Sequence, residues 1–236
     1  MKPIYIPKGK AKEYGDYAIN IYTGCPHECY YCFAPNVLRR DREKFHTNVA
    51  PREGIVEAVK KQIEREKITG KLIHLCFTCD PYPTGYDSTP TREIIKILKD
   101  SGNNVQILTK GDGSRDFDLL DENDWYGITV TCMSDLREKS EPNALSAARR
   151  HGGLVAAKMR GIKTWVSCEP VLNAEDILWY LANSRNVIDK VKIGKLNYYP
   201  SNIDWKTFGE NVEALCKKLN IDYYIKDSLR AEMAGE

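Results

Sequence analysis

The chain has 236 residues, of which 42% are hydrophobic and 29% are charged, so it can bury one sizeable core and is neither disordered nor fibrous. Its formal net charge of +2 excludes a broad positive field for nucleic acid, although local basic patches are compatible with it. The first residues hold no apolar run fit for a signal sequence, and no stretch reaches the about 18 apolar residues that span a membrane. We therefore expect a soluble cytoplasmic protein with no membrane partner.

Short apolar runs alternate along the chain with longer amphipathic segments, a rhythm typical of repeated βα units. The apolar runs predict six strands, at residues 17–22, 71–78, 104–109, 126–132, 163–168 and 190–196. A seventh strand is possible at residues 223–225. No internal repeat or linker divides the chain, so a single domain over residues 1–236 is the default interpretation.

The segments between the strands carry apolar residues at helical spacing. In residues 52–66, for example, Ile55, Val59 and Ile63 fall on one face. Helices are predicted at residues 52–66, 92–99, 144–159, 174–183 and 205–219. Parallel strands joined by helices follow right-handed crossovers, which leaves an open doubly wound sheet or a full or partial barrel. Both architectures place their chemistry at the carboxyl ends of the strands.

Polar residues follow most of the predicted strands. The strand ends supply a thiol, carboxyl groups, amines and an amide from Cys25, Asp80, Lys110, Glu169, Lys195 and Asn197. Strand ends are often simply solvated, and that explains any single one of these residues. Together they favour one site that is assembled from distant segments.

Three closely spaced cysteines stand in the segment "IYTGCPHECYYCFAP", at Cys25, Cys29 and Cys32. In a reducing cytosol, eight cysteines in a chain of this size indicate metal-binding or catalytic thiols rather than disulfides. Structural zinc takes four protein ligands, so a zinc site here needs His27 or a distant thiol. Iron-sulfur clusters are held by cysteine thiolates at compact spacings, and three ligands on four irons leave one iron free.

The spacing Cys25-x3-Cys29-x2-Cys32, directly after a first strand and before repeated βα units, resembles the radical S-adenosylmethionine superfamily. The resemblance covers residues 16–200. The segments "YTGCPHECYYCFAP", "CDPYPTGYDSTPTREIIKIL", "VQILTKG" and "TWVSCEPV" are similar to the branch related to spore photoproduct lyase. The resemblance implies an α/β fold with a partial (β/α)6 barrel of the TIM type, followed by a C-terminal helix and the possible extra strand within residues 201–236.

The resemblance also implies the cofactors and the reaction. The three cysteines hold a 4Fe-4S cluster whose unique iron binds S-adenosylmethionine, and one electron from the reduced cluster cleaves the sulfonium. The product is a 5'-deoxyadenosyl radical that abstracts hydrogen from the substrate, while the protein positions and shields the reacting groups. The implied partner is an electron donor such as flavodoxin or ferredoxin.

Four positions are candidate contacts to S-adenosylmethionine. Tyr31 matches the aromatic position that packs near adenine in the family, although ordinary loop packing also explains it. Lys110 is suited to the methionine carboxylate. Asp80 is a candidate acceptor for the methionine ammonium, but the family's glycine-rich turn is missing there, and a turn role before Pro81 is an alternative. Thr131, or its neighbour Thr129, is a candidate for the ribose, although strand propensity alone explains both.

The remaining candidates lie at other strand ends. Glu169, Lys195 and Asn197 are candidates for contacts to substrate or cofactor, and Glu169 is equally expected as a structural anchor. Spore photoproduct lyase returns a hydrogen atom from a cysteine near its second strand, and Cys79 falls in the corresponding region. A role for Cys79 as a hydrogen donor is therefore a hypothesis, beside its alternative as a buried small hydrophobe.

The leading interpretation is a radical enzyme with an unidentified substrate. Repair of a DNA photolesion is one option, and modification of a peptide, an RNA base or a small metabolite is another. The segment "NVLRRDREKFH" is the best candidate for nucleic-acid phosphates, although a solvated charged segment explains it too. The interpretation from another class is a non-catalytic zinc or iron-sulfur module that contacts nucleic acid or a protein.

Overall fold

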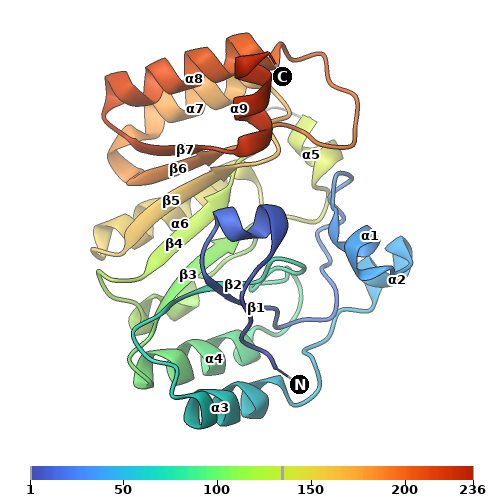
Figure 1. Cartoon of the computed structure of the whole chain (residues 1–236), viewed down its shortest axis with the longest axis vertical. Helices are drawn as coiled ribbons and strands as arrows, with labels where there is room; N and C mark the ends of the chain where they lie inside the picture. Colours follow the sequence, from blue (N-terminus) through green and yellow to red (C-terminus); the bar gives the residue numbers. More distant parts are fainter. Residues whose placement is uncertain (1, 134–135, 236) are drawn as a thin grey trace.

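The computed structural model describes residues 2–133 and 136–235 and contains one parallel sheet (Figure 1). Each strand pairs with the next one along the chain, so the order across the sheet is β1-β2-β3-β4-β5-β6-β7. The strands are β1 (Tyr17–Ile19), β2 (Leu72–Leu75), β3 (Asn104–Thr109), β4 (Trp125–Thr129), β5 (Lys163–Cys168), β6 (Lys190–Ile193) and β7 (Asp222–Ile225). Sequential parallel order with no described pairing between β1 and β7 is the topology of an open, partial barrel. The predicted fold class is confirmed.

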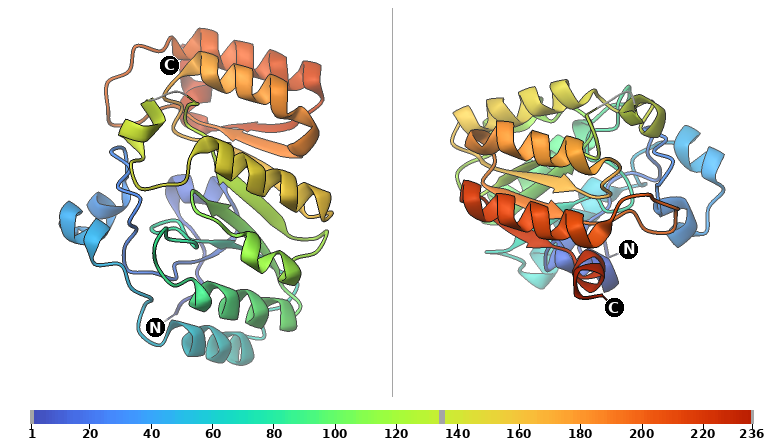
Figure 2. Two further views of the ribbon diagram at one scale, coloured as in Figure 1. Left: turned by 180° about the vertical axis from the view of Figure 1, so that it is seen from behind. Right: turned by 90° about the horizontal axis from the view of Figure 1, so that it is seen from above.

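Helices connect the strands and cover the outer face of the sheet (Figure 2). The long ones are α3 (Ile55–Glu66), α4 (Thr89–Asp100), α6 (Ala147–Met159), α7 (Ala174–Ser184) and α8 (Trp205–Leu219). Shorter helices are α1 (Ala34–Leu38), α2 (Arg42–Thr47), α5 (Leu136–Ser140) and α9 (Asp227–Ala234), and 3₁₀ turns are η1 (Gly9–Glu13), η2 (Ser114–Leu119) and η3 (Arg185–Val187). Apolar residues at helical spacing explain the long helices: Val59 and Ile63 of α3 are buried, as predicted. Among the described residues, no helix has the length and apolar character needed to cross a membrane.

Several predicted strands end earlier than their apolar runs, because the chain turns outward at the carboxyl edge. Strand β2 stops at Leu75, and Cys76 then adopts a left-handed backbone with φ of 70°. The amides of Phe77 and Thr78 donate to the side chain of Asn20, at 2.8 and 2.9 Å, instead of to a neighbouring strand. Apolar character therefore extends beyond the ladder into loops that form the edge of the sheet. At the other end of the chain, the possible seventh strand is a full member of the sheet.

The inner face of the sheet is filled partly by the N-terminal segment. Turn η1 lies across this face in Figure 1, and Tyr14 follows it directly. The ring of Tyr14 packs against the rings of His74, Phe77 and Trp165, with centroids 5.7, 5.7 and 6.0 Å away. The ammonium of Lys192, from β6, lies 4.5 Å from the centre of the Tyr14 ring. The interior is thus packed with aromatic and charged side chains from β2, β5, β6 and the N-terminal segment.

At the centre of the sheet, a buried tryptophan packs closely over a glycine of the neighbouring strand. The buried indole of Trp165 on β5 passes over Gly127 on β4 and donates to the carbonyl of Ile107 on β3, at 2.8 Å. A Cβ atom at position 127 would meet the indole Nε1 at 2.1 Å, a distance that real Cβ atoms do not show. Glycine at 127 is therefore a packing requirement of this sheet.

We predict that Gly127→Ala lowers the free energy of unfolding by about 2–4 kcal/mol, because it overpacks the core and displaces a buried hydrogen bond. The matched control is Gly152→Ala in α6, where a Cβ atom meets nothing within 4 Å. The control should gain up to about 1 kcal/mol, as expected for alanine in a helix. Urea unfolding measures the stability of both variants. Equal unfolding midpoints for Gly127→Ala and the wild type would contradict the close packing of Trp165 over Gly127.

Candidate functional site

The three cysteines lie on the loop between β1 and α1, at the carboxyl edge of the sheet (Figure 1). The loop is held by main-chain bonds: the Cys32 amide donates to the Cys29 carbonyl at 3.0 Å, and the Cys25 amide donates to the Phe45 carbonyl at 3.2 Å. A Cβ atom on Gly24 would meet that same Phe45 carbonyl at 2.2 Å, so glycine permits the close approach of α2. The loop and α2 form one packed unit.

Arg42 of α2 is the main side chain that fixes the cysteine loop. Its guanidinium donates to the carbonyls of Cys32 at 3.1 Å, of Tyr30 at 2.7 Å, and of Cys29. A planar fork with several donors suits this task, because one lysine ammonium does not span three fixed carbonyls. His46 adds a contact of 2.7 Å between its Nδ1 and the carbonyl of Cys25. The sequence placed Arg42 in a candidate phosphate-binding segment, and nothing in the charge pattern indicated that it would serve the cysteine loop.

The chemistry of the thiols fits a metal cluster. Burial raises the pKa of Cys29 to about 12 and raises those of Cys25 and Cys32, so the free thiols stay protonated at neutral pH. Bound metal supplies the positive charge that turns such thiols into thiolates. The Lys110 ammonium acts in the same direction on Cys29 and Cys32. Three thiols, one buried and two partly exposed, beside a cation are the donor set that an iron-sulfur cluster requires.

His27 lies between the first two cysteines, but its ring is engaged elsewhere. Its Nδ1 lies 3.5 Å from an Asp80 carboxylate oxygen, and its Nε2 lies 3.0 Å from the Thr84 hydroxyl and accepts the Thr84 amide at 3.3 Å. Burial lowers the pKa of His27, so the ring is neutral. These partners give the ring a structural role between the cysteine loop and the loop after β2, and they count against His27 as the fourth ligand of a zinc ion.

Asp80 joins three segments at the carboxyl edge. One oxygen accepts the Thr109 hydroxyl at 2.5 Å and the Tyr82 amide at 2.8 Å, and the other accepts the Lys110 amide at 2.8 Å. The bond to Tyr82 is the turn interaction that the sequence offered as an alternative. The structure therefore places Asp80 beneath Lys110, where it fixes the end of β3.

Tyr31, Lys110 and Thr131 meet at a buried carboxylate that the sequence did not single out, Glu141. Glu141 accepts the Tyr31 hydroxyl, accepts the Thr131 hydroxyl at 3.2 Å, and pairs with the guanidinium of Arg150. The Lys110 ammonium lies 5.5 Å from the centre of the Tyr31 ring. Burial opposes the charge on Lys110, whereas the carboxylate of Glu141 favours it, and the pKa of Lys110 is raised. A persistent cation and a fixed aromatic ring thus lie beside the cysteine loop.

Arg150 explains why a carboxylate is tolerated at this depth. Its guanidinium is buried and also donates to the carbonyls of Leu145 and Thr129, at 2.8 and 2.9 Å. Burial alone would raise the pKa of Glu141, but Arg150 and Lys110 lower it, so the pair stays ionised. No sequence motif indicated this pair, because its members contribute to the site only through the tertiary fold.

Glu169 lies on the inner face of the sheet rather than among these residues. It accepts the Lys226 ammonium at 2.7 Å and the Tyr14 hydroxyl. Lys226 also pairs with Glu13 at 3.0 Å. Burial, together with the neighbouring ammonium groups, lowers the pKa of Lys192 to about 8. The anchor role that the sequence offered for Glu169 describes these contacts, and its catalytic role stays a prediction.

Lys195 and Asn197 follow β6 and make contacts with the two ends of the chain. Lys195 pairs with Glu232 of α9, and the side-chain amide oxygen of Asn197 accepts the Lys10 ammonium at 3.0 Å. Cys79 lies behind the cysteine loop, where its sulfur accepts the Tyr22 amide at 3.4 Å. The structure does not bring these three residues to the network around Glu141, so their roles stay predictions.

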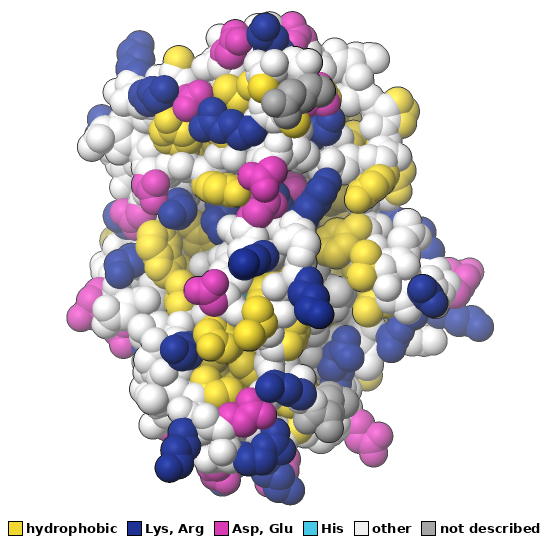
Figure 3. All heavy atoms as spheres, in the orientation of Figure 1, with side chains coloured by type: hydrophobic (Ala, Val, Ile, Leu, Met, Phe, Trp, Pro, Cys, Tyr) yellow, Lys and Arg dark blue, Asp and Glu magenta, His cyan; other side chains and the backbone are white. Residues whose placement is uncertain are grey.

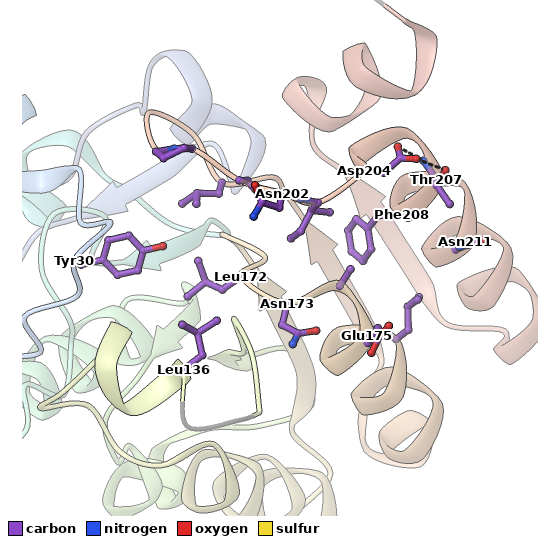
Figure 4. A pocket seen from close by; sticks show the side chains of 16 residues that line it. Tyr30, Leu136, Leu172, Asn173, Glu175, Asn202, Asp204, Thr207, Phe208 and Asn211 are labelled. Carbon is purple, nitrogen blue, oxygen red and sulfur yellow. Dashed lines mark hydrogen bonds between the residues drawn. The ribbon is translucent and has the colours of Figure 1, made fainter.

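A pocket opens beside the cysteine loop, between α5, the start of α7, the segment after β6, and α8 (Figure 4). It has a volume of about 620 Å³, within the range of ligand pockets. Tyr30 of the cysteine loop forms one wall, and its carbonyl accepts the Tyr199 hydroxyl at 2.8 Å. The lining is apolar at Leu136, Leu172, Leu178, Leu196, Ile203 and Phe208, and polar at Asn173, Glu175, Ser201, Asn202, Asp204, Thr207 and Asn211.

An open parallel barrel with a three-cysteine loop after its first strand defines a class of iron-sulfur enzymes. Comparison with known families identifies this class. The model of the Radical SAM superfamily matches residues 19–173, and the chain belongs to this superfamily.

Two curated relatives match much of the chain. The uncharacterized protein MJ0683 of Methanocaldococcus jannaschii is 29% identical over 178 residues, which cover 73% of this chain and 64% of that protein. The uncharacterized protein ORF301 of Acidianus two-tailed virus is 30% identical over 179 residues, which cover 69% of this chain and 58% of that protein. The matched region thus spans less than two thirds of either relative.

Solved structures share the fold. A mutant of spore photoproduct lyase superposes with a TM-score of 0.71 at 12% identity, over 94% of this chain and 79% of the other. Streptococcus suis SuiB bound to the precursor peptide SuiA gives a TM-score of 0.67 at 12% identity, over 92% of this chain and 51% of the other. At such identities the likeness establishes the fold alone.

We predict that Arg42→Ala lowers the iron retained after anaerobic reconstitution by about tenfold, because residues that orient metal ligands contribute about 10–100-fold to metal affinity. Arg42→Lys should also lose iron, since lysine keeps the charge but not the planar guanidinium that donates to three carbonyls. The matched control is Arg39→Ala, an exposed neighbour outside this hydrogen-bond network. Iron and sulfide per chain measure the outcome, and full retention in Arg42→Ala would contradict the role.

Proposed function

We propose that the chain is a radical S-adenosylmethionine enzyme in which Cys25, Cys29 and Cys32 hold a 4Fe-4S cluster. The observation that carries the proposal is the loop itself: it provides three thiols at the carboxyl edge of the sheet, and the nearby ring of His27 is engaged by Asp80 and Thr84. A cluster with three protein ligands keeps one iron for S-adenosylmethionine. The enzyme acts in the reducing cytoplasm and draws single electrons from a donor such as flavodoxin or ferredoxin.

The cofactors would supply a 5'-deoxyadenosyl radical that abstracts hydrogen from the substrate. The residues around them have binding and positioning roles. Lys110 provides the charge for the methionine carboxylate, and Asp80 positions Lys110 through its amide. Tyr31 offers a ring to adenine, with its hydroxyl fixed by Glu141. Thr131 donates to the same carboxylate and so supports this arrangement beside its expected contact with the ribose.

We predict that the reconstituted protein, reduced with dithionite, converts S-adenosylmethionine into 5'-deoxyadenosine and methionine. Cys29→Ala should abolish both products, because a cluster ligand is lost. Cys216→Ala is the control: this buried cysteine lies on α8, away from the loop, and its variant should keep the activity. Chromatography of the products gives the measurement. Intact S-adenosylmethionine in the presence of a demonstrably reduced cluster would overturn the proposal.

The pocket beside Tyr30 favours a peptide over DNA as the substrate. Among the described residues, its lining includes the carboxylates of Glu175 and Asp204 and three asparagine amides, and no lysine, arginine or histidine. A phosphodiester would meet repulsion there, whereas amides and an apolar floor suit a polypeptide. Spore photoproduct lyase complexed with a dinucleoside photoproduct and SuiB bound to a peptide share the fold alike, so the fold does not choose between these substrates.

We predict that DNA carrying spore photoproduct is not repaired by the reconstituted protein. Its addition should leave both the lesion and the yield of 5'-deoxyadenosine unchanged, because the described lining of the pocket offers no cationic side chain to a phosphate. Mass spectrometry of the digested DNA measures the lesion, with authentic spore photoproduct lyase as the positive control. Disappearance of the lesion would establish repair and overturn the peptide assignment.

A further inference from the structure

Helices α1 and α2 form an arm, residues 33–47, that projects from the body directly after the third cysteine (Figures 1 and 2). The arm is coupled to the cysteine loop because Arg42 donates to the carbonyls of Cys29, Tyr30 and Cys32. Its outer surface is free of the rest of the chain. A protein bound to this arm would therefore lie next to whatever the cysteines hold.

The arm exposes apolar side chains at helical spacing. Phe33 is 48% exposed and Val37 is 66% exposed, and the amide of Val37 donates to the carbonyl of Phe33 one turn earlier. Residues at i and i+4 lie on the same side of a helix, so these two form one apolar strip. Two large apolar side chains left in water beside a cysteine loop are typical of a surface that a partner covers.

The arm also carries exposed cations. Arg39 and Lys44 are exposed, and neither side chain has an ion-pair partner among the described residues. Figure 3 shows several Lys and Arg side chains on the projecting arm, at the right of the molecule, with an acidic side chain among them. Of the two carboxylates in the arm, Asp41 is occupied as the cap of α2, where it accepts the Lys44 amide at 2.9 Å. The arm holds Arg39, Arg40, Arg42 and Lys44 against Asp41 and Glu43, so it has a net positive charge as well as an apolar strip.

We propose that the arm is the docking surface for an acidic protein that delivers single electrons to the site. The inference rests on the proposed function, because it needs a redox group on the cysteines. Apolar side chains together with charged ones are typical of a protein interface, and the net positive charge of the arm favours a negative partner. Nucleic acid fits less well, since of the two residues of the strip only Phe33 offers a ring for base stacking and aliphatic Val37 does not.

The transfer moves one electron and no atoms. The reduced flavin or iron-sulfur centre of the donor is oxidised by one electron, and the group held by Cys25, Cys29 and Cys32 is reduced by one. A donor docked on the arm would lie close to the group held by the cysteines, because Phe33 follows Cys32 directly in the chain.

The test compares two charge-reversal pairs in the reconstituted protein. Arg39→Glu/Lys44→Glu changes the arm, and Lys60→Glu/Lys67→Glu makes the same change on α3. The pairs are matched, because Arg39 and Lys67 both follow a helix in the left-handed conformation and Lys44 and Lys60 both lie exposed on helices. The probes are flavodoxin, an acidic flavoprotein, and dithionite, a small reductant that needs no docking surface. Binding of flavodoxin is measured directly, and the formation of 5'-deoxyadenosine is measured with each reductant.

At low salt, the arm variant should bind flavodoxin about tenfold more weakly and support about tenfold slower flavodoxin-driven cleavage, while its dithionite-driven rate stays at the wild-type value. The difference should shrink as salt rises, because exposed charges are screened. Val37→Asn should weaken binding at both low and high salt, since it removes apolar contact. The α3 variant should match the wild type throughout.

Equal binding of flavodoxin to the arm and α3 variants would overturn the inference. So would a loss of oligonucleotide binding in the arm variant with flavodoxin binding intact, which would assign the arm to nucleic acid. Failure of the wild type with dithionite would instead refute the proposed function, and the binding measurement would still report on the arm.

Discussion

The site depends on the hydrogen bonds that the buried carboxylate of Asp80 accepts. A carboxylate buried at the edge of a sheet is costly unless its oxygens are satisfied, and here they bind the Thr109 hydroxyl and the amides of Tyr82 and Lys110. The same carboxylate lies beside the ring of His27. One buried charge thereby fixes the loop after β2, the end of β3 and the cysteine loop relative to one another. The position of Lys110 beside Tyr31 follows from this bracing.

The second buried pair, Glu141 with Arg150, extends this rigidity to β4. Arg150 binds the Thr129 carbonyl, while Glu141 binds Tyr31 and Thr131. The aromatic ring next to the third cysteine is therefore held by a residue more than a hundred positions away. Such preorganisation suits a site that must hold a reactive species without rearranging, because groups already in place do not need to be ordered during the reaction.

The sequence predicted the elements whose signals are local. Strands at 104–109 and 163–168 were predicted at their observed bounds, since turn residues bracket their apolar runs. The cysteine loop was recognisable from its spacing together with its place after the first strand of a chain of βα units. Short helices α1, α2 and α9 were not predicted, because five to eight residues carry too little periodicity. Arg42 and Glu141 were missed for a different reason: their roles depend on which carbonyls and hydroxyls the fold places beside them, and charge patterns do not encode this.

The packing of Glu13 has a consequence for how the protein is made. Its carboxylate accepts the Tyr224 hydroxyl at 3.2 Å and pairs with Lys226, more than 200 positions later in the chain. Contacts of such sequence separation close slowly, because the loop entropy must be lost before they form. Glu13 is synthesised early, but it can make these contacts only after β7 and Lys226 have been synthesised. Apart from the bond of Tyr199 to Tyr30, the contacts of the cysteine loop described above are to residues 40–150. Most of these contacts can therefore form while the inner face of the barrel is still open.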